Sequence, residues 1–232
     1  MTTLTAQQAQ TKVLVWDLPT RLFKWSLVLT VVGAYITAQF SSNTYTLHKY
    51  FGMAVLVLVV FRVLWGFFGG STSRFATFVA SPGTAISYLI DKRRSPVKRY
   101  LGHNPAGGLM IVTLLVFLLL QTFTGMVASD GLDANGPFAD SVLPLISTIG
   151  DAVHKVSVYA LMAFVAVHIG TNIWAQYHGE PLITAMVSGE KPADDYADAR
   201  AARAGQMWVA FACLAVAAVS VIGIVRFYGA AL

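Results

Sequence analysis

Residues 154–170 read HKVSVYALMAFVAVHIG, and they carry the strongest indication of how the chain folds. Between its two histidines, His154 and His168, Lys155 is the one charged residue. A spacing of fourteen residues is almost four helical turns, so the two imidazoles fall within about 40° of the same helix face and about 21 Å apart along the axis. An apolar helix of this kind, with a polar group toward each end, predicts a membrane-spanning segment.

The composition of the whole chain also points to a lipid environment. Of its 232 residues, 56% are hydrophobic and 12% charged, which lies outside the range of soluble globular domains. The net charge is +5, but the basic residues gather in polar linkers, and membrane topology explains this better than a nucleic-acid partner does. The single cysteine, Cys213, excludes an intramolecular disulfide, a cysteine-ligated iron–sulfur cluster and a covalent CxxCH haem attachment.

Five windows are apolar enough to cross a bilayer core about 30 Å thick, which takes about 20 helical residues. They are residues 22–40, 49–68, 108–128, 152–174 and 207–227, and all eight prolines lie outside them. The sequence therefore predicts an all-α integral membrane protein. Its expected parts are an N-terminal segment (1–21), a four-helix transmembrane core (22–175), a linker (176–206) and a fifth transmembrane helix with the C-terminus (207–232).

The charges of the linkers predict an orientation. Linker 69–107 holds one acid, Asp91, and six bases, whereas linker 129–151 holds four aspartates and no base. The bases are Arg74, Lys92, Arg93, Arg94, Lys98 and Arg99; the aspartates are Asp130, Asp133, Asp140 and Asp151. The positive-inside rule then puts the N-terminus and linkers 69–107 and 175–206 in the cytoplasm, and it puts segment 41–48, linker 129–151 and the C-terminus on the opposite side.

Few ionisable side chains lie inside the windows, and each is a candidate functional residue because a charge in lipid is costly. The candidates are Lys24, Arg62 and His168, with His48 and His154 at the mouths of two spans. His48 and Arg62 repeat the spacing of His154 and His168, so the two helices present polar groups at two matching depths. We expect His48 beside His154 and Arg62 beside His168.

Imidazoles at equal depth on adjacent helices can clamp a haem iron from both faces, so the pattern predicts non-covalent haem with His48, His154 and His168 among its ligands. For a lone histidine near a helix end, an interfacial position is the alternative. Arg62 either contacts a haem propionate, extends toward the cytoplasmic surface or bonds a backbone carbonyl. Zinc is disfavoured because it needs three or four ligands at one point, whereas these histidines divide between two depths.

Four motifs together resemble the bacterial cytochrome b561 family, which includes the b-type cytochrome subunit of nickel–iron hydrogenases. They are VWDLPTRLFKW (15–25), HKYFGMAVLVLVVFRVLWG (48–66), GHNPAGG (102–108) and HKVSVYALMAFVAVHIG (154–170). The resemblance covers residues 13–190 and leaves the fifth window unmatched. It implies a four-helix haem-binding bundle with two haems b: His48 and His154 hold one near the periplasm, and His168 with a residue of the first span holds one near the cytoplasm.

At that position of the first span the family usually has histidine, whereas this chain has Lys24. Lys24 lies about 24 Å from the periplasmic end of its window, which is about the depth of His168. Burial can lower the pKa of a lysine, and a metal can replace its proton. The hypothesis is a haem with His168 and Lys24 as ligands. The alternatives are that Lys24 reaches the cytoplasmic surface or that the second haem is absent.

His103 of GHNPAGG is expected where the third span enters from the cytoplasm. There it contacts a propionate or a quinone, or it has only a capping or interfacial role. The Asn-Pro and Gly-Gly pairs of the same motif predict a turn, a helix start and a close approach of helices. His178, after the fourth span, is expected to be a solvated linker residue.

Two haems stacked across a bacterial inner membrane predict electron transfer between the quinone pool, ubiquinone or menaquinone, and a redox partner. The acidic linker 129–151 favours a basic periplasmic partner such as a soluble c-type cytochrome. One alternative is a superoxide:quinone oxidoreductase, for which Lys49 and Lys155 offer some positive charge beside the histidines. Another is a membrane anchor and electron-relay subunit of a periplasmic dehydrogenase or hydrogenase. Whether the chain is itself an enzyme is left open.

Overall fold

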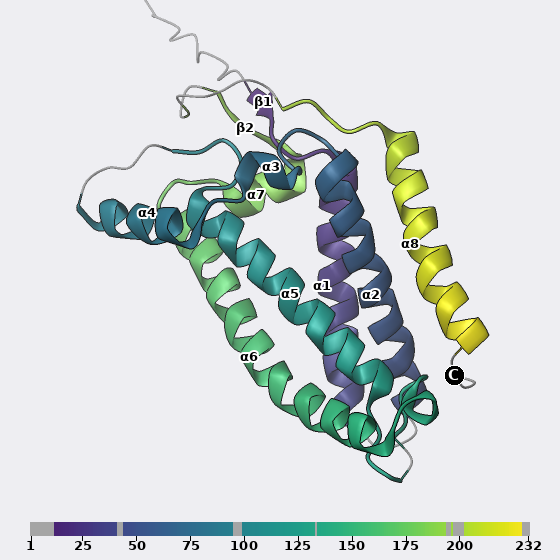
Figure 1. Cartoon of the computed structure of the whole chain (residues 1–232). Coiled ribbons are helices and arrows are strands. Elements are labelled where there is room, and N and C mark those ends of the chain that lie inside the picture. Colours follow the sequence, from purple (N-terminus) through teal and green to yellow (C-terminus); the bar gives the residue numbers. More distant parts are fainter. Residues whose placement is uncertain are drawn as a thin grey trace, which may run out of the picture.

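A computed structural model gives the fold and describes residues 12–40, 44–94, 99–132, 134–193, 196 and 202–228 (Figure 1). Five of its helices are long and apolar enough to cross a membrane, as the sequence predicts. They are α1 (Leu18–Gln39), α2 (Tyr45–Phe68), α5 (Pro105–Val127), α6 (Pro144–Tyr177) and α8 (Met207–Tyr228). The chain is a multi-pass membrane protein. The largest departure from the expected bounds is α6, which begins at Pro144 instead of residue 152.

Local signals explain where these helices begin. Asp17 precedes α1, and its carboxylate accepts the backbone N–H of Thr20 at 3.1 Å. Asn104 precedes α5, and its Oδ1 accepts the N–H of Gly107 at 2.8 Å. In α1, α5 and α6 a proline occupies the first turn, where its missing N–H would have no partner within the helix. The GHNPAGG motif therefore starts a helix, as expected.

The helices pack as two pairs. α1 packs on α2, α5 packs on α6, and contacts between α2 and α5 join the pairs. The shared core consists of Val55 and Val59 of α2, Leu115 and Leu118 of α5, and Leu161 of α6. α1 and α6 are not among the element pairs in extensive backbone contact in the described residues.

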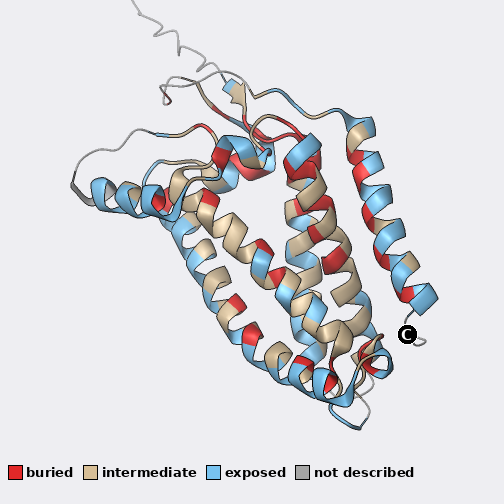
Figure 2. Cartoon of the chain, in the orientation of Figure 1, coloured by how far each residue is buried: buried red, intermediate tan, exposed pale blue. Residues whose placement is uncertain are grey.

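α8 lies against the outer face of α2, outside the four-helix core (Figure 1). Its buried residues recur every three or four positions and lie on the side turned to α2 (Figure 2). They are Ala210, Cys213, Ala217, Val221 and Val225. Three of them, Ala210, Cys213 and Ala217, join a cluster with Phe23, Phe61 and Trp65. The small side chains let α8 approach the aromatic residues of α2 closely.

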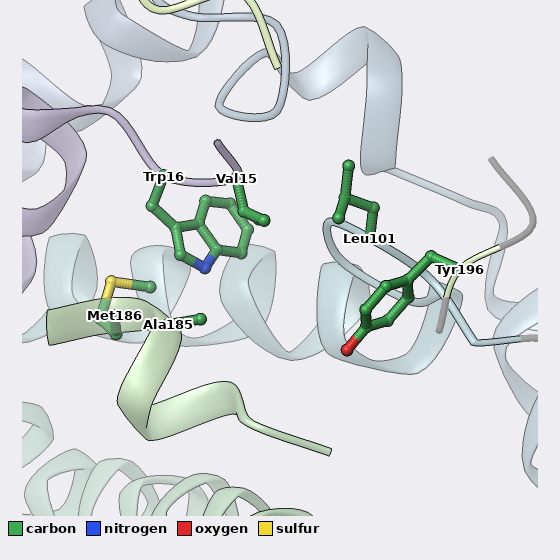
Figure 3. Close-up of a cluster of buried hydrophobic side chains, with 6 residues drawn as sticks. All are labelled: Val15, Trp16, Leu101, Ala185, Met186 and Tyr196. Atoms are coloured by element: carbon green, nitrogen blue, oxygen red, sulfur yellow. The ribbon is translucent and has the colours of Figure 1, made fainter. Parts of the chain in front are cut away.

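The N-terminal segment and the linkers before α5 and α8 meet at one end of the bundle, called here the β1 end. There β1 (Lys12–Leu14) pairs antiparallel with β2 (Glu190–Pro192), beside α3 (Phe75–Phe78), α4 (Pro82–Arg94) and α7 (Leu182–Ser188). Six buried side chains form its core (Figure 3): Val15, Trp16, Leu101, Ala185, Met186 and Tyr196. At the opposite end, the His48 end, residues 128–143 connect α5 to α6 through the short helix η2 (Ala139–Ser141).

A buried hydrogen-bond network joins four segments at the β1 end. The Thr20 hydroxyl contacts Asp17 Oδ1, lies 2.6 Å from Ser73 Oγ and accepts the indole N–H of Trp65 at 3.1 Å. The other carboxylate oxygen of Asp17 accepts the N–H of Gly205 at 3.0 Å. This network ties the start of α1 to α2, to the loop after α2 and to the residues that lead into α8.

Candidate functional site

His48 and His154 meet at the His48 end of the four-helix core. His48 lies in the first turn of α2 and His154 lies in α6, and their ring centroids are 6.0 Å apart with the rings nearly perpendicular, at 82°. His48 Nδ1 lies 2.8 Å from the carbonyl oxygen of Ala34 in α1, and His154 Nδ1 lies 2.8 Å from that of Gln121 in α5. A carbonyl only accepts hydrogen bonds, so each Nδ1 carries the proton and each neutral ring keeps its lone pair on Nε2.

Gln121 also holds His154 through its side chain. Its amide nitrogen donates to the carbonyl of His154 at 3.1 Å and lies 3.3 Å from His154 Nε2, while its Oε1 accepts the hydroxyl of Ser157 at 2.6 Å. Sequence reasoning missed this residue. The signal was an uncharged polar side chain in the middle of the apolar run LLLQTF, where a buried amide needs partners.

A second group of polar side chains gathers toward the β1 end, around His103. The His103 ring lies between Trp16 and Phe78, with centroids 4.5 and 4.7 Å away. Its Nδ1 is buried and has no hydrogen-bond partner among the described residues. Burial lowers the pKa of His103 well below its ordinary value. Positive charge on Arg62, Lys24, Lys191 and His168 adds to this shift. Among the residues predicted at the cytoplasmic depth, Arg62 lies close to His103, because both side chains lie against the ring of Phe78.

Arg62 is 3% exposed, so it does not extend to the surface. Its guanidinium lies over the rings of Phe75 and Phe78, 5.1 and 5.7 Å from their centroids. Its Nη1 is buried and has no hydrogen-bond partner among the described residues. A buried guanidinium donor without an acceptor is costly, which makes Arg62 a strong binder for an anionic group that enters this region.

Lys24 and His168 are both half-buried, on α1 and α6 respectively. The amide of Asn172 donates to the carbonyl of His168 at 2.6 Å and lies 3.4 Å from His168 Nδ1. His178 is exposed just after α6; its Nδ1 donates to the carbonyl of Trp174 at 2.7 Å and its ring stacks on that tryptophan. Within the described ranges, no three His, Cys, Asp or Glu side chains gather in a way that could hold a metal ion alone.

Comparison with known proteins assigns the chain to a family. A family model described as prokaryotic cytochrome b561 matches residues 15–189. The chain belongs to the prokaryotic cytochrome b561 family. The probable Ni/Fe-hydrogenase B-type cytochrome subunit of Azotobacter vinelandii is 26% identical over 214 residues, which cover 78% of this chain and 88% of the relative. The corresponding subunit of Azotobacter chroococcum mcd 1 is 25% identical over 193 residues, covering 69% and 80%. No solved structure matches the chain.

As a member of the b561 family, the chain is a membrane b-type cytochrome with a role in electron transport, and the cofactor of the family is haem b. The residues at both ends fit this cofactor. Neutral imidazoles are common ligands of haem iron, and the rings of His48 and His154 lie 6.0 Å apart, each with its lone pair on Nε2. The unpartnered Nη1 of Arg62 suits a haem propionate. The family match ends before α8.

Proposed function

We propose that this b561-family cytochrome carries electrons between the quinone pool and a redox partner through two haems b, one toward each end of the four-helix core. The observation that carries the proposal is the His48–His154 pair, whose rings lie 6.0 Å apart with both Nδ1 atoms held by backbone carbonyls. Because the carbonyls come from α1 and α5 and the rings from α2 and α6, all four core helices define this site.

At the His48 end, His48 and His154 are the residues that would hold the haem iron. The carbonyls of Ala34 and Gln121 fix the tautomer of each ring and its direction, and an N–H donated to a carbonyl makes the opposite ring nitrogen a stronger electron-pair donor. Haem b supplies a reversible one-electron centre when it is bound. Neither histidine needs to lose a proton to act, because Nε2 already carries the lone pair.

Toward the β1 end, His168 and Lys24 are the proposed ligands of the second haem, and Arg62 donates to one of its propionates. The lowered pKa of His103 keeps this imidazole neutral near pH 7, so it can donate or accept a hydrogen bond to a propionate or to a quinone. A lysine amine in place of the histidine usual in the family would give the two haems different ligand sets and therefore different potentials.

The position of the basic linkers supports a cytoplasmic β1 end. Linkers 69–107 and 175–206 both meet the N-terminal segment there, and the first of them carries six bases. The His48 end carries the aspartates of linker 129–151; Asp133 lies outside the described residues. With five spans the C-terminus then faces the periplasm.

The redox partner at the periplasmic end is proposed to be a c-type cytochrome, a dehydrogenase or a hydrogenase. The two relatives carry the name of hydrogenase cytochrome subunits, which supports a membrane-subunit role here. Superoxide chemistry has less support, because the cations expected to attract the anion are engaged: Lys155 pairs with Asp151 at 2.8 Å, and Lys49 lies over the ring of Tyr45.

The haem content of the purified full-length protein tests the proposal. We expect two haems b per polypeptide by pyridine haemochrome assay, two waves in a potentiometric titration, and reduction of both by a quinol. A haem-replete preparation without a Soret band would refute the account. Rapid quinone-dependent turnover with superoxide in stopped-flow mixing would favour the oxidoreductase instead.

A further inference from the structure

Helix α4 has 13 residues and lies across the β1 end of the bundle instead of along it (Figure 1). At about 1.5 Å per residue it is about 20 Å long, too short to cross a bilayer. It packs on α5, and its Ala85 is 1% exposed. Most of the remaining α4 residues with described side chains are exposed, so this helix forms part of the protein surface.

The end of α6 shows at which depth α4 lies. α4 packs on α5 at the β1 end of the bundle, where α5 begins and α6 ends (Figure 1). The last turn of α6 exposes both Trp174 and Tyr177. Exposed Trp and Tyr at the end of a spanning helix settle at the membrane–water interface. α4 therefore lies level with the interface.

One face of α4 is apolar and exposed. Ile86, Leu89 and Ile90 are 57%, 51% and 44% exposed, and their spacing of three and four residues puts them on one side of the helix. Three neighbouring aliphatic side chains are unfavourable in water, whereas at an interface such a face sinks toward the acyl chains. All three side chains stay exposed although α4 packs on α5, so the described residues leave much of this apolar face uncovered.

The last turn of α4 is basic. It reads Asp91, Lys92, Arg93, Arg94, a formal charge of +2. Cations at a helix C-terminus are favoured by the helix dipole in any surrounding. A run of three bases at the end of an amphipathic helix that already lies at membrane level also attracts anionic headgroups.

We propose that α4 is an interfacial helix, with Ile86, Leu89 and Ile90 among the acyl chains, and that its basic last turn binds the headgroups of anionic phospholipids. This surface is separate from both haem sites and does not depend on them. The expected ligand is a lipid such as phosphatidylglycerol, because the apolar face supplies a site for the chains that a soluble phosphate does not have.

The test uses the full-length protein in detergent, with Cys213→Ala and Leu89→Cys, and an environment-sensitive fluorophore on the new cysteine. Three probes are titrated: phosphatidylglycerol, phosphatidylcholine and inorganic phosphate. We expect a blue shift with both lipids and an apparent affinity at least tenfold higher for phosphatidylglycerol. The double variant Arg93→Gln/Arg94→Gln should weaken that affinity about 25-fold, roughly fivefold per removed charge. The control Arg226→Gln removes an exposed charge at the end of α8 and should change nothing.

Equal affinities for the two lipids, equal losses in the control variant, or full competition by phosphate would each overturn the proposal. A second measurement, with the native charges kept, covers the case of a variant that misfolds. Spin labels at Leu89 and at Ser87, which lies about 100° from Ile86 around the helix, are compared in bilayers. Leu89 should collide mainly with oxygen and Ser87 with a water-soluble nickel complex; the reverse pattern contradicts an interfacial α4.

Discussion

Gly125 of α5 leaves the space in which the imidazole of His154 lies. A Cβ at position 125 would be 2.7 Å from Cε1 and 2.9 Å from Nδ1 of that ring. Both distances are far below van der Waals contact, so any larger residue here has to push the ring away from its carbonyl partner on Gln121.

Gly125→Ala should therefore weaken the haem site at the His48 end without removing a ligand. We expect the haem content to fall from two toward one per polypeptide, measured by pyridine haemochrome assay. Gly52→Ala on α2 is the matched control, because a Cβ there meets nothing within 4 Å. An unchanged content in Gly125→Ala would show that the ring does not have to keep its present position.

Replacing either proposed ligand should remove the same haem. His48→Ala and His154→Ala should each lose about half of the Soret absorbance, since one imidazole holds iron much more weakly than two. His178→Ala serves as the control because His178 is exposed and its ring bonds the carbonyl of Trp174 at the end of α6. Full haem content in both ligand variants would exclude bis-histidine ligation by this pair.

Substitution of Lys24 tests the proposed ligand set of the second haem. Lys24→Ala should lower the haem content or change the low-spin signals in low-temperature electron paramagnetic resonance, whereas Lys24→His should restore a bis-histidine signature. Two haems with unchanged spectra in both variants would remove Lys24 from the ligand set. The signals of the His48–His154 haem provide an internal reference in the same sample.

Arg62→Gln tests the proposed propionate contact. Loss of a buried cation beside a haem disfavours the reduced form, so the midpoint potential of the haem toward the β1 end should fall, by about 60 mV if the electron affinity drops tenfold. Potentiometric titration measures both haems at once. If the other haem shifts equally, or neither shifts, Arg62 does not neutralise a propionate at this site.

The lowered pKa of His103 predicts sensitivity to acid. Its pKa in the folded protein lies well below the value of about 6.5 expected in the unfolded chain, so below pH 6.5 the unfolded state takes up the proton first. Stability should then fall as the pH drops from about 6.5 toward the lowered pKa, by at most about 1.4 kcal/mol per pH unit. His103→Phe keeps a ring between Trp16 and Phe78 and cannot titrate, so its Tm should fall less from pH 7 to pH 5.

The five spans could be predicted because each is a long apolar run, and bilayer thickness sets the scale. The sequence predicts a shorter fourth span, residues 152–174, than the helix α6 that the structure shows. Its first two turns, residues 144–151, mix polar and apolar residues and so fall outside a hydropathy window, although Pro144 marks a helix start. The approach of His48 to His154 was predictable for a similar reason, because helical periodicity converts equal spacings into equal depths.

The partners of the predicted residues were not accessible from periodicity. The carbonyls of Ala34 and Gln121 carry no side-chain signal, and the burial of Lys191, whose ammonium donates to the carbonyl of Leu101 at 2.9 Å, depends on two linkers folding together. Such contacts join residues far apart in sequence. They follow from packing at the β1 end, which no local pattern specifies.

The bond from the Gly205 N–H to the Asp17 carboxylate joins residues 188 positions apart. The ribosome synthesises the first membrane helix long before it reaches residue 205. This hydrogen bond of the Asp17 carboxylate can therefore form only when synthesis is almost complete. The contact between the start of α1 and the residues before α8 at the β1 end is therefore formed late in biogenesis. A nascent chain that stops after the fourth span would lack the N–H of Gly205, so this oxygen of Asp17 would be without that partner at the β1 end.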